Sequence, residues 1–127
     1  MAEIKDCIGK NVKISRGSIT IKENGKTCGV VKNITSLYDM QPNKQMDFYK
    51  KIKTLARETN LPIGKISIKE IIIKDGKMYI FRNVKSKLFY EEHGYFSEEE
   101  KAKAELMEKI YNTCRNNGIE VIECIFV

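Results

Sequence analysis

Two short glycine turns constrain the fold of this chain more than any other feature of its sequence. Asn24-Gly25 and Asp75-Gly76 each lie between segments in which apolar and polar residues alternate. Alternation with a period of two is typical of β-strands, and Asn-Gly or Asp-Gly in a two-residue loop favours a type I′ hairpin turn. The sequence therefore predicts two antiparallel hairpins, one around residue 25 and the other around residue 76.

The first hairpin extends into a three-stranded meander over residues 11–31. Arg16-Gly17 supplies a second turn, which joins NVKIS to SITIKE, and KTCGVV follows the Asn24-Gly25 turn. The predicted pairs, all with their side chains on one face, are Ile14–Ile19, Val12–Ile21, Ile21–Cys28 and Ile19–Val30. A shift of one residue would turn these side chains to the other face, so the agreement of both turns with one apolar face defines the register.

The second hairpin spans about residues 66–82 and is apolar on both faces. The predicted pairs are Ile73–Met78 and Ile71–Ile80 on one face and Ile72–Tyr79 on the other. A strand that is apolar on both sides has to be covered on both sides. We therefore expect a helix on one face and another element or a partner subunit on the other.

Two helices are predicted, one in the middle of the chain and one near its end. The first covers about residues 44–59, from an N-cap at Asn43 to a stop at Asn60 and Pro62. The second begins at a capping box, Ser97-Glu98-Glu99-Glu100, whose acidic residues suit the first turn of a helix. The final segment, IEVIECIFV, is apolar at nearly every position and is predicted to be a strand.

The order of these elements is βββ-α-ββ-α-β. The sequence therefore predicts one α+β domain over residues 1–127, built from an antiparallel β-meander, a β-hairpin and two helices. The tail strand, which follows a helix, either inserts between the two hairpins or adds to a neighbouring chain.

Four cysteines are spread along the chain without a Cys-x-x-Cys pair: Cys7, Cys28, Cys114 and Cys124. The first residues show no signal peptide, and no apolar run approaches the roughly 20 residues of a membrane span. We therefore expect a cytoplasmic protein without membrane association, whose cysteines are buried free thiols. One histidine and four scattered cysteines do not supply the ligands of a metal site, and no cofactor is predicted.

The residue pattern does not indicate an enzyme. His93 is the only histidine, so a Cys or Ser nucleophile would reach a histidine base only through the tertiary fold. NGKT at 24–27 resembles the end of a phosphate-binding P-loop, but Thr20 stands where that motif needs glycine. The hairpin turn explains the same four residues without a phosphate.

The net charge of +6 is unevenly distributed. Residues 1–90 carry a net charge of +11, whereas residues 91–127 carry −5. Such a division steers an anion to one side of the molecule, packs an acidic helix against a basic sheet, or stacks protomers head to tail. Lysine supplies 19 of the 23 basic residues and isoleucine occurs 18 times. Both residues have AT-rich codons, so the composition points to a low-GC bacterium or its phage.

The segment FRNVKSKLFYEEHGYF, residues 81–96, combines cations with aromatic rings. Arginine and lysine bind phosphate, and flat rings stack on bases. The alternative is structural: a further short strand and a hydrophobic staple onto the next helix. A chain that uses lysine almost everywhere but keeps a few arginines also favours bidentate recognition at those positions. The candidate ligand-binding residues are Arg82, Asn83, Tyr90, Lys85, Phe89 and His93 in this region, and Arg57 and Arg16 elsewhere.

These features predict a small non-enzymatic binding protein for a phosphate-bearing ligand. A nucleotide or a short oligonucleotide, including a cyclic one, would be held by Arg, Lys and stacked rings in a pocket between protomers. A phage counter-defence protein that sequesters a nucleotide signal fits this composition. The alternative is a protein–protein inhibitor or adaptor, from a phage or mobile element, that acts on a nucleic-acid-binding enzyme.

Two further expectations concern partners. A long nucleic-acid duplex is less expected, because the acidic last helix would repel phosphates on its side. The two-faced apolar hairpin, the apolar tail strand and the charge division together predict a homo-oligomer.

Overall fold

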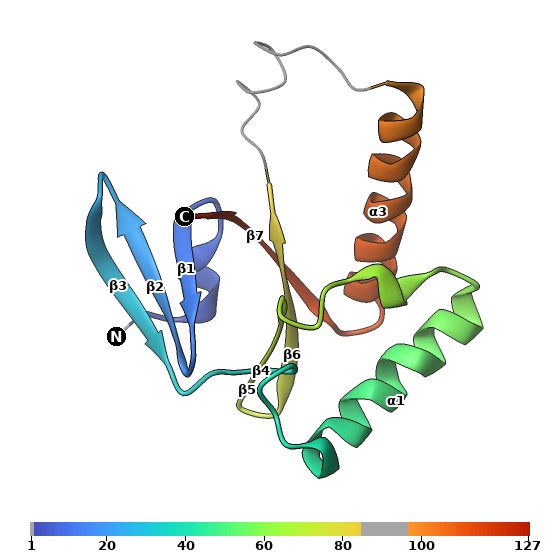
Figure 1. Cartoon of the computed structure of the whole chain (residues 1–127), viewed down its shortest axis with the longest axis horizontal. Coiled ribbons are helices and arrows are strands. Elements are labelled where there is room, and N and C mark those ends of the chain that lie inside the picture. Colours follow the sequence, from blue (N-terminus) through green and yellow to red (C-terminus); the bar gives the residue numbers. More distant parts are fainter. Residues whose placement is uncertain (1, 85–96) are drawn as a thin grey trace.

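The computed structural model describes residues 2–84 and 97–127, whose helices and strands follow the predicted α+β order (Figure 1). The elements are η1 (Ile4–Cys7), β1 (Asn11–Ser15), β2 (Ser18–Glu23), β3 (Lys26–Lys32), β4 (Thr35–Ser36), α1 (Pro42–Thr59), η2 (Ile63–Lys65), β5 (Ile71–Lys74), β6 (Lys77–Asn83), α3 (Glu98–Asn116) and β7 (Glu120–Phe126). The short elements η1, β4 and η2 are additions to the predicted order. The α+β class and the sequence βββ-α-ββ-α-β are confirmed.

β7 lies at the centre of a seven-stranded sheet with the order β3-β2-β1-β7-β6-β5-β4. Its residues Glu120 to Cys124 pair in parallel with β6, whereas Ile125 and Phe126 pair in parallel with β1. The remaining neighbours are antiparallel. Insertion of the tail strand between the two hairpins is therefore confirmed, and β7 joins the meander to the second hairpin.

The meander has the predicted register on one side and a different register on the other. Between β1 and β2 the pairs are Val12–Ile21 and Ile14–Ile19, as predicted. Between β2 and β3 the prediction is wrong: the pairs are Ile21–Gly29 and Ile19–Val31, instead of Ile21–Cys28 and Ile19–Val30.

A β-bulge in β3 causes this shift. Cys28 is the extra residue, because the pairing moves by one position between Lys22 and Ile21. A bulged residue leaves the strict alternation of a strand, so Cys28 is exposed although a buried thiol was predicted. A Cβ at Gly29, the next residue, would lie 3.0 Å from the Cβ of Ala2. Glycine therefore allows the N-terminal residues to pack directly on the strand.

The second hairpin has the predicted register, with the pairs Ile71–Ile80, Ile72–Tyr79 and Ile73–Met78. Asp75 and Gly76 both have left-handed backbone conformations, with φ values of 51° and 74°. Asn24 and Gly25 have φ values of 52° and 77°. Two successive positive φ values are the signature of a type I′ turn, so both turns form as their sequences predict.

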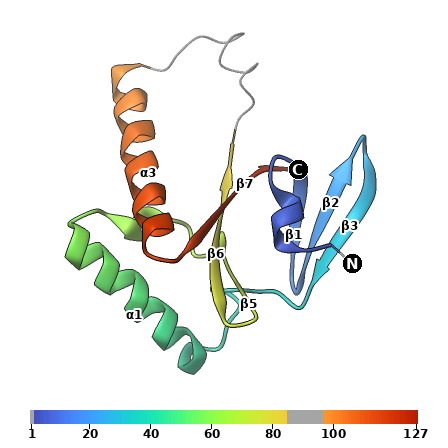
Figure 2. The ribbon, with the colours of Figure 1, turned by 180° about the vertical axis from the view of Figure 1, so that it is seen from behind.

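The helices cover one face of the second hairpin (Figure 2). This core contains Ile71, Ile73 and Ile80 from the hairpin, Leu55 from α1 and Ile110 from α3. All five side chains are buried, which removes their apolar surface from water and stabilises the contact between sheet and helices.

The meander covers the opposite face. Ile72 and Phe81 of the hairpin and Ile122 of β7 form a second core with Val12 and Ile19 of the meander. The expectation that both faces are covered is confirmed, and the second cover comes from the chain itself. Two features that predicted a homo-oligomer were the two-faced hairpin and the apolar tail strand. The apolar side chains of both are covered within one chain. The oligomeric state stays a prediction that depends on the charge division.

The ends of both helices have identifiable causes. α1 begins two residues before the predicted start because Pro42 occupies the first helical position, where its missing N–H and fixed φ are favourable. It ends at Asn60, whose backbone is left-handed. α3 begins as predicted, and the Ser97 hydroxyl accepts a hydrogen bond of 3.4 Å from the Glu100 N–H. Neither these helices nor the shorter ones of the described residues have the length and apolar content that a bilayer span requires.

The bulge predicts a selective reactivity among the four thiols. Burial raises the pKa of Cys7 to about 11 and that of Cys124 to about 12, and it also raises the pKa of buried Cys114. Thiolates react with disulfide reagents and neutral thiols do not, so at about pH 8 only Cys28 should be labelled in the folded protein. The measurement is the number of thiols per chain that react before and after addition of denaturant. Cys28→Ser should abolish labelling of the folded protein; rapid labelling of a second thiol would contradict the burial described here.

Candidate functional site

Arg82, the first candidate residue, lies near the end of β6 and is held by the protein's own side chains. Its Nη2 atom is 2.5 Å from Oε1 of Glu108 on α3, and its Nη1 atom is 3.4 Å from Oε1 of Glu123 on β7. The guanidinium carbon lies 4.6 Å from the centroid of the Tyr111 ring. Only 17% of the Arg82 side chain is exposed. The guanidinium therefore connects β6, α3 and β7.

The charges around Arg82 favour its ionised form and that of its partner. The hydrogen bond from Arg82 holds the pKa of Glu108 below its ordinary value. Burial acts to lower the pKa of Arg82, but the hydrogen bond and the charges of Glu108 and Glu123 outweigh it and raise the pKa. Burial also raises the pKa of Tyr111, so its ring stays neutral beside the cation. Arg82 thus has internal anionic partners without a phosphate.

The other described candidates lie on separate parts of the fold. Asn83 is exposed at the end of β6, Arg57 is exposed on α1, and Arg16 is exposed in the turn between β1 and β2. In Figures 1 and 2 the end of β6 and the turn between β1 and β2 lie at opposite ends of the sheet, and α1 packs on the face of the second hairpin that is turned away from the meander. The structure therefore does not bring the candidate arginines together. Lys85, Phe89, Tyr90 and His93 lie outside the described residues.

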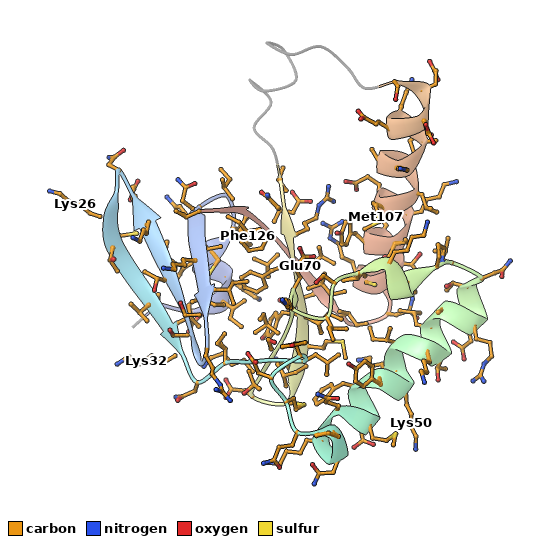
Figure 3. The ribbon with its side chains drawn as sticks, viewed as in Figure 1. Lys26, Lys32, Lys50, Glu70, Met107 and Phe126 are labelled. Atoms are coloured by element: carbon orange, nitrogen blue, oxygen red, sulfur yellow. The ribbon has the colours of Figure 1, made fainter. Side chains whose placement is uncertain are left out.

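Arg16 lines a surface hollow of about 370 Å³ between the meander and the residues that precede β5. The other lining residues are Ile14, Ser15, Ser36, Tyr38, Asp39, Lys69, Glu70 and Phe126. Figure 3 labels two of them, Glu70 and Phe126, near the middle of the molecule. A volume of this size lies at the lower end of the range for small-molecule sites.

The hollow lies beside the part of β1 that does not pair with β7. β1 pairs with β7 only through Asn11 and Val12. The remaining residues of β1, from Lys13 to Ser15, have no partner in β7, and the hollow lies beside them. The residues that line the hollow therefore belong to strands and turns, and these strands and turns pack on the two cores.

The hollow combines cations, an aromatic ring and hydroxyl groups. Tyr38 is 57% exposed, and the Lys69 ammonium lies 5.2 Å from the centroid of its ring. Arg16 adds a guanidinium and Ser15 a hydroxyl group. Two acids are also present, and burial raises the pKa of one of them, Glu70. Cations and ring suit a phosphate attached to a flat group, while a carboxylate accepts hydrogen bonds from hydroxyls.

Sequence reasoning found Arg16 in this hollow but missed its companions. Tyr38 and Asp39 belong to residues 33–43, a segment rich in turn-forming residues with no clear period. In the structure Ser36 pairs with Ile72 and its hydroxyl accepts a hydrogen bond of 3.3 Å from the Asp39 N–H. The position of Tyr38 thus depends on the long-range pairing of β4 with β5, which local patterns do not reveal.

Comparison of the chain with protein-family models, curated proteins and solved structures gives no match. In residues 2–84 and 97–127, His, Cys, Asp and Glu side chains form no group of three or more that could hold a metal ion.

The position of Arg82 predicts a loss of stability rather than a loss of ligand affinity on its substitution. Arg82→Met keeps an unbranched apolar chain but leaves Glu108 and Glu123 without their cation. We expect the free energy of unfolding in urea to fall by about 1–3 kcal/mol. Arg57→Met on α1 is the matched control, since exposed Arg57 has no ion pair within the described residues, and it should change stability by less than about 0.5 kcal/mol.

The ion pair of Arg82 with Glu108 makes the stabilisation by Arg82 depend on pH. A carboxylate whose pKa is lowered by folding stabilises the folded state above its ordinary pKa of 4.5, and this contribution is lost as the pH falls through the folded value. The difference in unfolding free energy between wild type and Arg82→Met should therefore shrink in acid. Equal effects of Arg82→Met and Arg57→Met at neutral pH would show that Arg82 does not stabilise the fold.

Proposed function

We propose that this chain is a non-enzymatic binding protein for a phosphate-bearing ligand with a flat ring, bound in the hollow beside Arg16. A nucleotide or a short oligonucleotide, linear or cyclic, is the class of ligand that fits. The observation that carries this proposal is the meeting of Arg16, Lys69 and the exposed ring of Tyr38 around one hollow.

Each group in the hollow has a role in such binding. The planar guanidinium of Arg16 forms two parallel hydrogen bonds with a phosphate, and the Lys69 ammonium adds a second positive charge. The Tyr38 ring offers a surface on which a base stacks, which contributes about 1–3 kcal/mol per base. Asp39 accepts hydrogen bonds from sugar hydroxyls.

A compact ligand fits this geometry better than a long duplex. The hollow has a volume of about 370 Å³, which suits a compact ligand. The first turn of α3 carries Glu98, Glu99 and Glu100, which repel a polyanion on that side of the molecule. The Lys- and Ile-rich composition suits a phage or mobile-element protein, for which sequestration of a nucleotide signal is the counter-defence role that we infer.

A thermal-shift screen against linear and cyclic nucleotides tests this function. At least one nucleotide should raise the melting temperature in a concentration-dependent way, because a ligand that binds only the folded state stabilises it. The corresponding nucleoside and inorganic phosphate should each have a smaller effect, since each retains only one of the two recognised groups.

Variants locate the binding site. Arg16→Ala and Tyr38→Ala should each weaken binding of that nucleotide by about tenfold or more, in line with the loss of a charged hydrogen bond or a stacked ring. Arg57→Ala removes an exposed arginine outside the hollow and should leave affinity unchanged. If no nucleotide shifts the melting temperature, or if Arg16→Ala binds like the wild type, the hollow is not a nucleotide site.

A further inference from the structure

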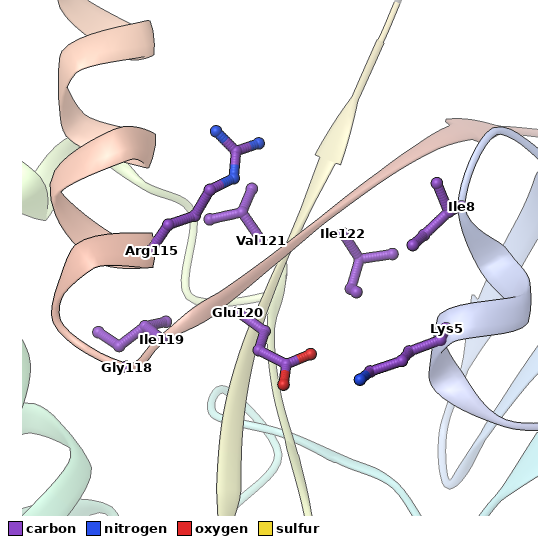
Figure 4. A pocket seen from close by; sticks show the side chains of 8 residues that line it. All are labelled: Lys5, Ile8, Arg115, Gly118, Ile119, Glu120, Val121 and Ile122. Atoms are coloured by element: carbon purple, nitrogen blue, oxygen red, sulfur yellow. The ribbon is translucent and has the colours of Figure 1, made fainter.

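A second hollow, of about 480 Å³, lies along β7 on the side that faces η1 (Figure 4). Lys5 and Ile8 line it from the N-terminal segment, and Arg115 lines it from the end of α3. Its remaining lining residues run consecutively along the chain from Gly118 to Ile122. A stretch of strand therefore forms its floor.

The backbone of β7 presents hydrogen-bonding groups to this hollow. In a parallel ladder, alternate residues of a strand direct their N–H and C=O groups to the same side. The Cys124 carbonyl accepts a hydrogen bond from Val84, beyond the end of β6, so even-numbered residues face β6. The Glu123 carbonyl accepts from Gly9 and the Ile125 N–H donates to Lys10, so odd-numbered residues face the opposite side.

Val121 therefore directs both its N–H and its C=O away from β6. In the part of the chain that the structure describes, β1 is the strand that pairs with β7 on this side, and its pairing starts only at Ile125. The edge of β7 before Glu123 is thus an open strand edge inside the sheet. Open edges are templates for the addition of another strand.

The side chains around this edge favour an apolar occupant. Ile8 is 56% exposed, although it is a large apolar residue. The Arg115 guanidinium is already used, because it lies 2.9 Å from the Glu123 carboxylate and donates a hydrogen bond to Asn112. The Lys5 and Glu120 side chains point toward one another across the hollow (Figure 4). Arg115 is thus paired with an acid, whereas the salt bridges within the described residues include neither Arg16 nor Lys69 of the first hollow.

We infer that this edge of β7 is a docking site for a short extended apolar segment of a partner protein, which adds as a strand beside Val121. Main-chain hydrogen bonds supply affinity in this mode, and side-chain contacts such as that with Ile8 supply specificity. η1 and the end of α3 form walls on either side, so the hollow admits a single segment rather than the edge of a second sheet. At about 3.3 Å per residue, the open edge accommodates roughly three or four residues.

The test uses random linear peptides of about ten residues, displayed on phage and selected on the full chain. The most enriched peptide is then synthesised and its effect on amide hydrogen exchange is measured by NMR. In the free protein the Val121 amide should exchange much faster than the Ile122 amide, which faces β6. The bound peptide should slow exchange at Val121 and leave Ile122 unchanged.

A matched pair of variants distinguishes peptide binding at the edge of β7 from unspecific binding to exposed apolar residues. Ile8→Asp should weaken binding of this peptide by about tenfold or more, whereas Met46→Asp, at an equally exposed apolar residue of α1, should not. The inference is overturned if no peptide is enriched, if the bound peptide leaves Val121 exchange unchanged, or if Ile8→Asp binds normally. Signals of Val121 that shift with protein concentration alone would assign the edge to a second copy of this chain and would also overturn it.

Discussion

The pairing of β7 with two strands at once is the interaction on which the rest of this structure depends. Glu120 to Cys124 extend the second hairpin, and Ile125 and Phe126 extend the meander. The side chains of β7 divide by face: Val121, with Ile119 just before the strand, joins the core beneath the helices, whereas Ile122 and Cys124 join the core beneath the meander. One strand thus completes both cores, which explains why its sequence is apolar at nearly every position.

The two surfaces to which we assign binding lie where β1 and β7 do not pair with each other. The last residues of β1 have no partner in β7, and the first residues of β7 have none in β1. One hollow forms beside each of these open stretches. Their chemistry differs, since Arg16 and Lys69 are available in the first, whereas Arg115 is neutralised in the second. Arg82 lies outside both hollows, where its contacts with Glu108, Tyr111 and Glu123 join β6, α3 and β7.

Local patterns predicted those features that local physics determines. The turn at Asp75-Gly76, the register of the second hairpin and the Ser97 cap all depend on neighbouring residues, and all three are confirmed. The exposure of Cys28 was mispredicted because the bulge in β3 interrupts the alternation on which the prediction depended. The internal pairing of Arg82 was missed because its partners lie 26 and 41 positions further along the chain, at Glu108 and Glu123. The companions of Arg16 were missed for the same reason.

Native-state hydrogen exchange in increasing urea tests most directly whether β7 unites the two cores. If it does, the slowest amides of β2 in the meander and of β5 in the second hairpin should converge on one free energy of opening, because neither core persists without β7. Convergence on two clearly different free energies would mean that the meander opens independently of the helix-covered hairpin. β7 would then not be the strand on which the whole fold depends.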